Sequence, residues 1–435
     1  MTDDTMKEPK LMVLHLLKLS NIYVVPMVLA GCTAICNHGI QLELVIGGKT
    51  IEQWLTEIKG RKREPKNAQA QRPQSFRDAV VQARVHRDRD HFIATIRGED
   101  LQYLFVEFQN GDRWVVRIPL APTLAAPPAD KLESEVAVMK LIAATTSIPV
   151  PEVHAYALGD GPEPFPSFLI LEYVEGHQID YAELKSLPDA QRTRLYASLA
   201  GIYIQLRRLV FPSVGRLSEG PVGPQITKRN TSIDLNMQEL EGLEPSAIQD
   251  LYYSSGTLSS ASRYVAMQLD LADNAFARGR GTVSDAKQGR DRLYHLHMFR
   301  QFTQGWLNDK FDHGPFVLAH GDLEIFNLVL DHDLNIVSVL DWEWSRVVPV
   351  QLFRPPLWLD STTIENLCHG ARYRRYLERF DSFLDVLRAR ERERYGNELL
   401  ANEWNKQKQK SGFMVAYALE NWTAMDWFAN RYINL

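Results

Sequence analysis

The chain has 435 residues, of which 45% are hydrophobic and 24% are charged. A chain of this length can bury a large core and form two or three domains, or two lobes with extensions. Its formal net charge of -5 gives no general attraction to nucleic acid or to an anionic membrane. The three cysteines, Cys32, Cys36 and Cys368, are too few for a disulfide framework. We therefore expect a cytoplasmic protein that does not bind nucleic acid.

The N-terminal segment is apolar but short. Residues 11–36 are largely apolar, and the unbroken run at 22–36 is shorter than the roughly 20 residues that a membrane-spanning helix needs. The opening residues are not net positive, which argues against a secretory signal. Residues 29–32 match the cleavage box of bacterial lipoproteins, a short pattern that also arises by chance. We interpret the segment as a buried or incidental leader without a membrane partner, and targeting or anchoring is the alternative.

The region after the leader has the periodicity of a small antiparallel sheet with one helix. Apolar residues run or alternate over short stretches, as in consecutive strands. Asn110, Gly111 and Asp112 form a strong turn signal between two of these stretches. The expected elements are a polar linker at 56–76, a helix at 76–85, strands at 91–96, 103–108 and 114–118, a helix at 132–143 and a strand at 168–171.

The remainder of the chain is mostly helical in pattern, and a strand pair at 316–340 interrupts it. Residues 211–260 are poorly periodic and rich in Gly, Pro, Ser and Asn, so we expect an irregular segment that covers a cleft or, alternatively, a solvated insertion. Helices are expected at 188–209, 261–277 and 291–309 and over most of the chain after 362. The pattern predicts an α+β fold with a leader and linker at 1–75, a sheet region at 76–175 and a helical region at 176–435.

The most informative stretch is 316–344. A strand ends at His320, a loop carries Asp322 and Asn327, and a hairpin with a polar turn at 331–335 leads to Asp341. This order separates one carboxylate from an amide–carboxylate pair that can converge on one ion. Phosphoryl transfer needs a carboxylate that accepts or orients the acceptor's proton, and hard oxygen ligands for Mg²⁺. Each residue alone could be a turn residue or a helix cap, but together their spacing favours phosphoryl transfer.

This stretch resembles a known family motif. His-Gly-Asp, four residues and Asn, followed by a hairpin that ends in Leu-Asp-Trp-Glu, is similar to the Brenner-type motif of aminoglycoside phosphotransferases and choline-kinase-like enzymes, and most of all to their fungal branch. The resemblance extends over about 76–360. It implies a bilobal protein-kinase-like fold, with a small antiparallel-sheet N-lobe, a larger and mainly helical C-lobe, and ATP or GTP in the cleft.

The resemblance also implies roles for residues of the catalytic stretch. Asp322 matches the family's catalytic base, and Asn327 and Asp341 match its Mg²⁺ ligands. His320 matches the position that braces the catalytic loop.

Upstream residues match the nucleotide-binding positions. Arg117 stands where the family has the basic residue that grips the α- and β-phosphates, and Glu135 matches its ion-pair partner. Glu172 to Val174 would be the hinge, whose backbone groups meet the adenine edge.

These features favour an ATP-dependent, Mg²⁺-assisted kinase that acts on a hydroxyl or amine of a small-molecule metabolite. The alternative is a catalytically weak or inactive kinase-like nucleotide-binding regulatory protein. Its support is arginine, not lysine, at position 117 and a nucleotide loop with the single glycine Gly98. A protein kinase is a weaker third hypothesis, because Asp341 is followed by Trp-Glu and not by Phe-Gly. The sequence names neither the acceptor nor the oligomeric state.

Overall fold

The computed structural model describes residues 90–97, 101–108, 112–119, 123–159, 167–221, 223–253, 256–361, 367 and 370–433, and four short strands between 35 and 50. The chain divides into two compact units, Met1–Trp54 and Leu55–Leu435. In the first unit, β1 (Ile35–Cys36) pairs with β2 (Ile40–Gln41), and β3 (Val45–Ile46) pairs with β4 (Lys49–Thr50). The leader up to residue 34, the linker and helix expected at 56–85, and Gly98 lie outside the described residues.

The second unit contains a five-stranded antiparallel sheet with the order β5-β6-β7-β9-β8. The four predicted strands are confirmed as β5, β6, β7 and β9, and β8 was not predicted. The strands are β5 (Asp90–Arg97), β6 (Leu101–Phe108), β7 (Arg113–Pro119), β8 (Val153–Ala157) and β9 (Phe168–Glu172).

Helix α4 (Pro128–Thr145) contains the helix that was predicted at 132–143. Its first residue is a proline, whose fixed φ suits the first turn and whose missing N–H would have no helical partner there. Leu132, Val136 and Met139 recur at helical spacing and are buried in the core. The helix contacts β8, and it also contacts elements that come much later in the chain.

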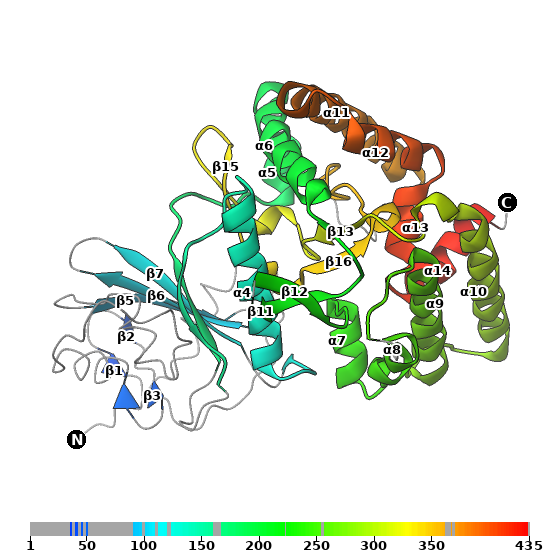
Figure 1. Ribbon diagram of the computed structural model, residues 1–435, viewed down its shortest axis with the longest axis horizontal. Helices are drawn as coiled ribbons and strands as arrows, with labels where there is room; N and C mark the ends of the chain where they lie inside the picture. The colour runs from blue at the N-terminus through cyan, green and yellow to red at the C-terminus, as the bar shows by residue number, and fades with distance from the viewer. Residues whose placement is uncertain are drawn as a thin grey trace, which may run out of the picture. The chain divides into compact units, whose positions relative to one another are not determined.

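Most of the chain after β9 is helical. The predicted helices at 188–209, 261–277 and 291–309 are confirmed as α6, α9 and α10 within a few residues. Helix α6 packs along α11, and α9, α10 and α14 lie together (Figure 1). The helices are α5 (Tyr181–Ser186), α6 (Asp189–Arg208), α7 (Ile233–Leu240), α8 (Pro245–Tyr253), α9 (Ala261–Arg278), α10 (Ala286–Trp306), α11 (Gly370–Tyr395), α12 (Leu399–Gln409), α13 (Gly412–Ala418) and α14 (Trp422–Phe428). Within the described residues, no helix is both long and apolar enough to cross a membrane.

Two small sheets carry the segment at 316–344. The predicted hairpin is confirmed, because β14 (Leu328–Leu330) pairs with β15 (Ile336–Val339) in antiparallel register. The strand before the loop, β13 (Phe316–Ala319), lies between β10 (Val210–Phe211) and β16 (Arg346–Pro349).

The expectation of an irregular segment at 211–260 was wrong. After β10, this segment forms the hairpin of β11 (Arg216–Gly220) and β12 (Gly223–Lys228), followed by α7 and α8. The β11 strand packs against α4, and the amide of Asn230 donates a hydrogen bond to the carbonyl of Val347 at 3.1 Å. Each element is too short for a clear hydrophobic period, although Ser232 caps α7 by accepting from the backbone N–H of Leu235. The hairpin is therefore packed against the rest of the fold and is not a solvated surface segment.

Candidate active site

A sharp loop connects β13 to the short helical turn η4 (Ile325–Asn327). At Gly321 the backbone has a φ of 88°, and a Cβ there would lie 2.1 Å from the carbonyl oxygen of Trp344. Only glycine fits this conformation and this close approach. The loop can therefore turn back against the Trp344 backbone and present Asp322 next in the chain.

His320 is buried and bridges the loop to the end of the hairpin. Its Nε2 donates to the carbonyl of Leu340 at 2.8 Å, and its Nδ1 accepts from the backbone N–H of Asp322 at 3.3 Å. One ring nitrogen therefore donates and the other accepts, which is the pattern of a neutral imidazole. Burial lowers the pKa of the His320 imidazole to about 4, so the ring is neutral at pH 7.

Asn327 fixes Asp322 and also contacts the hairpin. Its Nδ2 donates to the Asp322 carbonyl at 2.7 Å and to the Asp322 Oδ2 at 3.1 Å. The backbone N–H of Leu340 donates to the Asn327 carbonyl at 2.9 Å, which holds the loop against the residue before Asp341. Burial raises the pKa of the Asp322 carboxyl, and the hydrogen bond from Asn327 opposes this effect in part.

Asp341 ends the hairpin in a left-handed conformation, with φ 58° and ψ 54°. Such a backbone is uncommon for a residue other than glycine. The Asp341 Oδ1 lies 2.8 Å from Nη2 of Arg117 on β7. Arg117 also forms a buried ion pair with Glu135 of α4. Burial raises the pKa of Glu135, while the charge of Arg117 acts in the opposite direction.

Two cavities adjoin these residues. One, of about 360 Å³, is lined by Arg117, the segment 171–174 and Asp341, whereas Glu135 lies behind Arg117 and is not among the lining residues. The other, of about 480 Å³, is lined by His320 and Asp322 together with residues of α7, the segment 352–358 and the C-terminal helices. Because His320 lines one cavity and Leu340 lines the other, their hydrogen bond lies in the wall between the two cavities.

The predicted hinge residues line the smaller cavity. The backbone N–H of Tyr173, between Glu172 and Val174, donates to the Arg113 carbonyl at 3.1 Å. The Glu172 side chain is exposed, and its Oε2 accepts from the backbone N–H of Glu152 at 3.1 Å. The hinge is thereby tied to β7 and to the segment before β8.

Comparison with known proteins gives the family. The model of the APH phosphotransferase enzyme family matches residues 96–351, which is more than half of the chain and includes the catalytic stretch. The chain belongs to the phosphotransferase enzyme family. No curated protein matches it in sequence.

Solved structures that are similar to this chain include two other phosphotransferases. A macrolide 2'-phosphotransferase of type I has 15% identity and a TM-score of 0.41, covering 83% of this chain and 97% of its own. The GDP complex of aminoglycoside 2'-phosphotransferase-IIIa has 12% identity and a TM-score of 0.41, covering 81% of this chain and 97% of its own.

Two further charged residues, Glu343 and Lys131, belong to the cluster around Arg117, and the Glu343 Oε2 lies 3.9 Å from the Arg117 Nη2. The Nζ of Lys131 lies 3.0 Å from the Glu343 Oε2 and 3.6 Å from the ring centroid of Trp344. Burial raises the pKa of Glu343 to about 7, although Lys131 and Arg117 both oppose this. Lys131 precedes Glu135 by four residues on α4, and this helical spacing places both on one face. That spacing is the sequence signal that could have identified Lys131.

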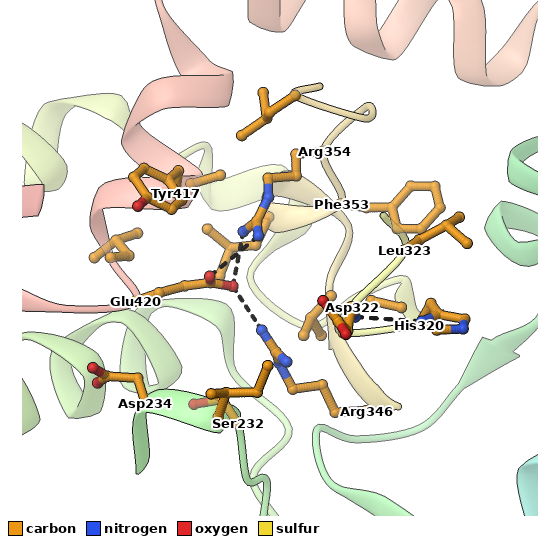
Figure 2. Close-up of a pocket in the computed structure, with 18 of the residues that line it drawn as sticks. Ser232, Asp234, His320, Asp322, Leu323, Arg346, Phe353, Arg354, Tyr417 and Glu420 are labelled. Carbon is orange, nitrogen blue, oxygen red and sulfur yellow. Dashed lines mark hydrogen bonds and ion pairs between the residues drawn. The ribbon is translucent and has the colours of Figure 1, made fainter. Parts of the chain in front are cut away.

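The larger cavity of this phosphotransferase holds a charged network across from Asp322. Arg346 and Arg354 approach Glu420 from two sides, with shortest distances of 2.6 and 2.8 Å (Figure 2). Burial opposes ionisation of Glu420, but the two guanidinium groups outweigh it and lower its pKa. Asp234 of α7 accepts from the Gln238 amide at 2.6 Å, and burial raises the pKa of Asp234 to about 6.

Proposed function

We propose that this phosphotransferase is an ATP-dependent kinase that phosphorylates a hydroxyl or amine of a small molecule. The observation that carries the proposal is that the candidate residues are distributed between two cavities. Asp322 opens into one, and Arg117 and Asp341 open into the other. The hydrogen bond between His320 and Leu340 joins the lining of one cavity to the lining of the other. A phosphate donor in one cavity and a phosphate acceptor in the other would present their reacting groups to each other.

The smaller cavity is the proposed nucleotide site. ATP or GTP would place its base against the hinge backbone at Glu172 to Val174 and its phosphates near Arg117. The guanidinium of Arg117 is held by Glu135 from behind and contacts Asp341 in front. A phosphate could exchange with Asp341 at this position while the pair with Glu135 stays intact, because guanidinium binds either anion through the same donors.

Asn327 and Asp341 have the right chemistry for a magnesium site. Asn327 makes its two hydrogen bonds to Asp322 with Nδ2, which leaves the amide oxygen as the atom suited to a hard cation. The Asp341 carboxylate is 27% exposed at the cavity. One carboxylate and one amide oxygen, completed by phosphate oxygens and water, match the ligands of Mg²⁺ in phosphotransfer sites. A bound ion would neutralise charge on the transferring phosphoryl group.

Asp322 is the proposed catalytic base. Its carboxylate faces the larger cavity and would accept or orient the acceptor's proton. Neutral His320 would hold the loop without adding a charge beside this carboxylate. In the same proposal, the sheet region at 76–175 and the helical region at 176–435 are the two lobes of a kinase-like fold, with residues 1–75 outside them.

The test is ADP release by the full chain with ATP and a panel of hydroxylated and aminated metabolites, in Mg²⁺ and in excess chelator. Acceptor-dependent and Mg²⁺-dependent ADP release, which falls to background in Asp322→Asn, is the expected result. Thermal stabilisation by Mg-ATP without turnover on any acceptor would favour the regulatory alternative. If Mg-ATP neither stabilises the protein nor is hydrolysed, the proposal is wrong.

A further inference from the structure

The mouth of the larger cavity has an apolar rim on α7. Ile233 and Met237 lie one helical turn apart, are 45% and 49% exposed, and line the cavity together with Asp322. Leu240 continues the same face of the helix and is 43% exposed, but it does not line the cavity. The two rim residues therefore expose apolar surface at the entrance, where an acceptor would pass or rest.

The acidic groups of this cavity already have hydrogen-bonding partners. Glu420 is paired with Arg346 and Arg354. Glu324 accepts from the Tyr181 hydroxyl at 3.0 Å, and Asp234 accepts from Gln238. A ligand that depended on several of these carboxylates would have to displace those partners, at a cost that its own contacts would need to offset.

Apolar side chains also form the wall of the cavity beside Asp322, although Phe353 and Trp358 among them are largely buried. Leu323, Phe353 and Trp358 line the same cavity, and the indole N–H of Trp358 donates to the Leu323 carbonyl at 2.7 Å. That hydrogen bond satisfies the polar atom of Trp358, so its ring can serve as an apolar wall. Apolar groups thus lie both at the rim and beside the proposed catalytic base.

We propose that the acceptor is amphipathic: a small alcohol whose hydroxyl lies at Asp322 and whose apolar portion contacts Ile233 and Met237. This inference rests on the proposed kinase function and specifies its substrate class. Single exposed apolar residues are normal on protein surfaces. Ile233 and Met237, in contrast, lie together on one face of α7 at the entrance of the cavity that Asp322 lines. A ligand's alkyl group bound there would remove apolar surface of both the ligand and the protein from water.

The test uses methyl, butyl and octyl β-D-glucosides, which share their hydroxyl groups and differ in the alkyl chain. Calorimetry with the full chain measures their dissociation constants, with octyl glucoside below its micelle concentration. Each methylene that becomes buried should tighten binding about fourfold, so octyl glucoside should bind at least about tenfold more tightly than methyl glucoside. In the double variant Ile233→Gln/Met237→Gln this preference should fall to about threefold or less, whereas Leu240→Gln, the matched control, should keep it.

Two results would overturn the inference. One is the absence of any preference for the longer chain, including no binding of octyl glucoside. The other is an unchanged preference in the double variant. Binding of Mg-ADP, measured on the same proteins, separates this failure from failure of the kinase proposal, because α7 does not line the nucleotide cavity. Mg-ADP binding without a chain-length effect overturns only the amphipathic acceptor, and absent Mg-ADP binding counts against the kinase itself.

Discussion

The Asp322 carboxylate is positioned by the Asn327 amide, five residues later in the chain. In Asp322→Asn, the new side-chain oxygen can still accept this hydrogen bond, so we expect the fold and Mg-ATP affinity to persist. An amide cannot take up the acceptor's proton, and loss of a positioned base costs about 10²–10⁴-fold. We expect kcat for ADP release to fall by that range while the calorimetric Mg-ATP affinity is unchanged. Near-full activity would remove Asp322 from the base role.

Gly321 is the residue whose backbone sets the direction of the loop. Gly321→Ala should destabilise the protein by about 2 kcal/mol or more, because the new methyl group would overlap the Trp344 carbonyl at a φ of 88°. The matched control is Gly201→Ala in α6, where a Cβ would meet no atom within 4 Å. Alanine should stabilise that helix by up to about 1 kcal/mol. Urea unfolding midpoints measure both changes, and similar midpoints in the two variants would contradict the steric argument.

His320 should make stability depend on pH in mildly acidic solution. Its pKa is about 4 in the folded protein and near 6.5 when exposed, so the unfolded chain binds the extra proton first as pH falls. The contribution of the neutral ring to the free energy of unfolding is fully present above pH 6.5. It decreases progressively towards pH 4, by up to about 3 kcal/mol. In His320→Gln this part of the decrease should disappear. If the free energies of unfolding of the two proteins decrease by the same amount from pH 7 to pH 4, His320 does not titrate as argued.

At the scale of elements, Arg117 connects β7 to α4 through its buried pair with Glu135. Arg117→Ala should weaken Mg-ATP binding and also reduce stability by about 3–5 kcal/mol, because Glu135 would keep a buried charge without its partner. Arg117→Lys should retain part of both properties, since lysine supplies the charge without the bidentate geometry.

The double variant Arg117→Ala/Glu135→Gln distinguishes the two roles of Arg117. Removal of the buried carboxylate should recover much of the lost stability but none of the nucleotide affinity. If calorimetry finds that nucleotide affinity returns together with the melting temperature, Arg117 supports the fold and is not a phosphate ligand.

Elements with a strong local signal could be predicted from the sequence. The strands β5 to β7 have alternating or continuous apolar residues, and α6, α9 and α10 are long enough for a clear helical period. β8 was missed because His154 interrupts its apolar residues and two of the five are alanines, which are weak strand formers, whereas β9, of the same length, has a continuous apolar run. The hairpin of β11 and β12 was missed because its stability depends on contacts with α4, which lies far away in the sequence.

The same distinction holds for the site at the scale of the whole molecule. Asp322, Asn327 and Asp341 are close in the sequence and joined by a predictable hairpin, so their proximity could be inferred. The pairing of Glu420 with Arg346 and Arg354 brings the C-terminal helices to the cavity. Nothing in the spacing of these residues indicates that they meet, because the contact depends on how the helices pack after the chain has folded.

The N-terminal segment gives a prediction for the whole chain. Deletion of residues 1–60 should leave a protein that melts cooperatively and binds Mg-ADP like the full chain. The described sheet begins at Asp90, and the family match begins at residue 96, so the deletion removes no strand of that sheet and no residue of the matched region. The second compact unit, Leu55–Leu435, would also lose only its first six residues.

The control is a longer deletion, of residues 1–100, which also removes β5. Since β5 pairs along β6, this deletion would expose the backbone N–H and carbonyl groups of β6 as a new sheet edge. We expect this protein to aggregate or to melt at a lower temperature, whereas the protein without residues 1–60 should do neither. Aggregation of both proteins, or loss of the cooperative melt in the shorter deletion, would mean that residues 1–60 stabilise the kinase core. The leader would then have to be treated as part of the folded enzyme.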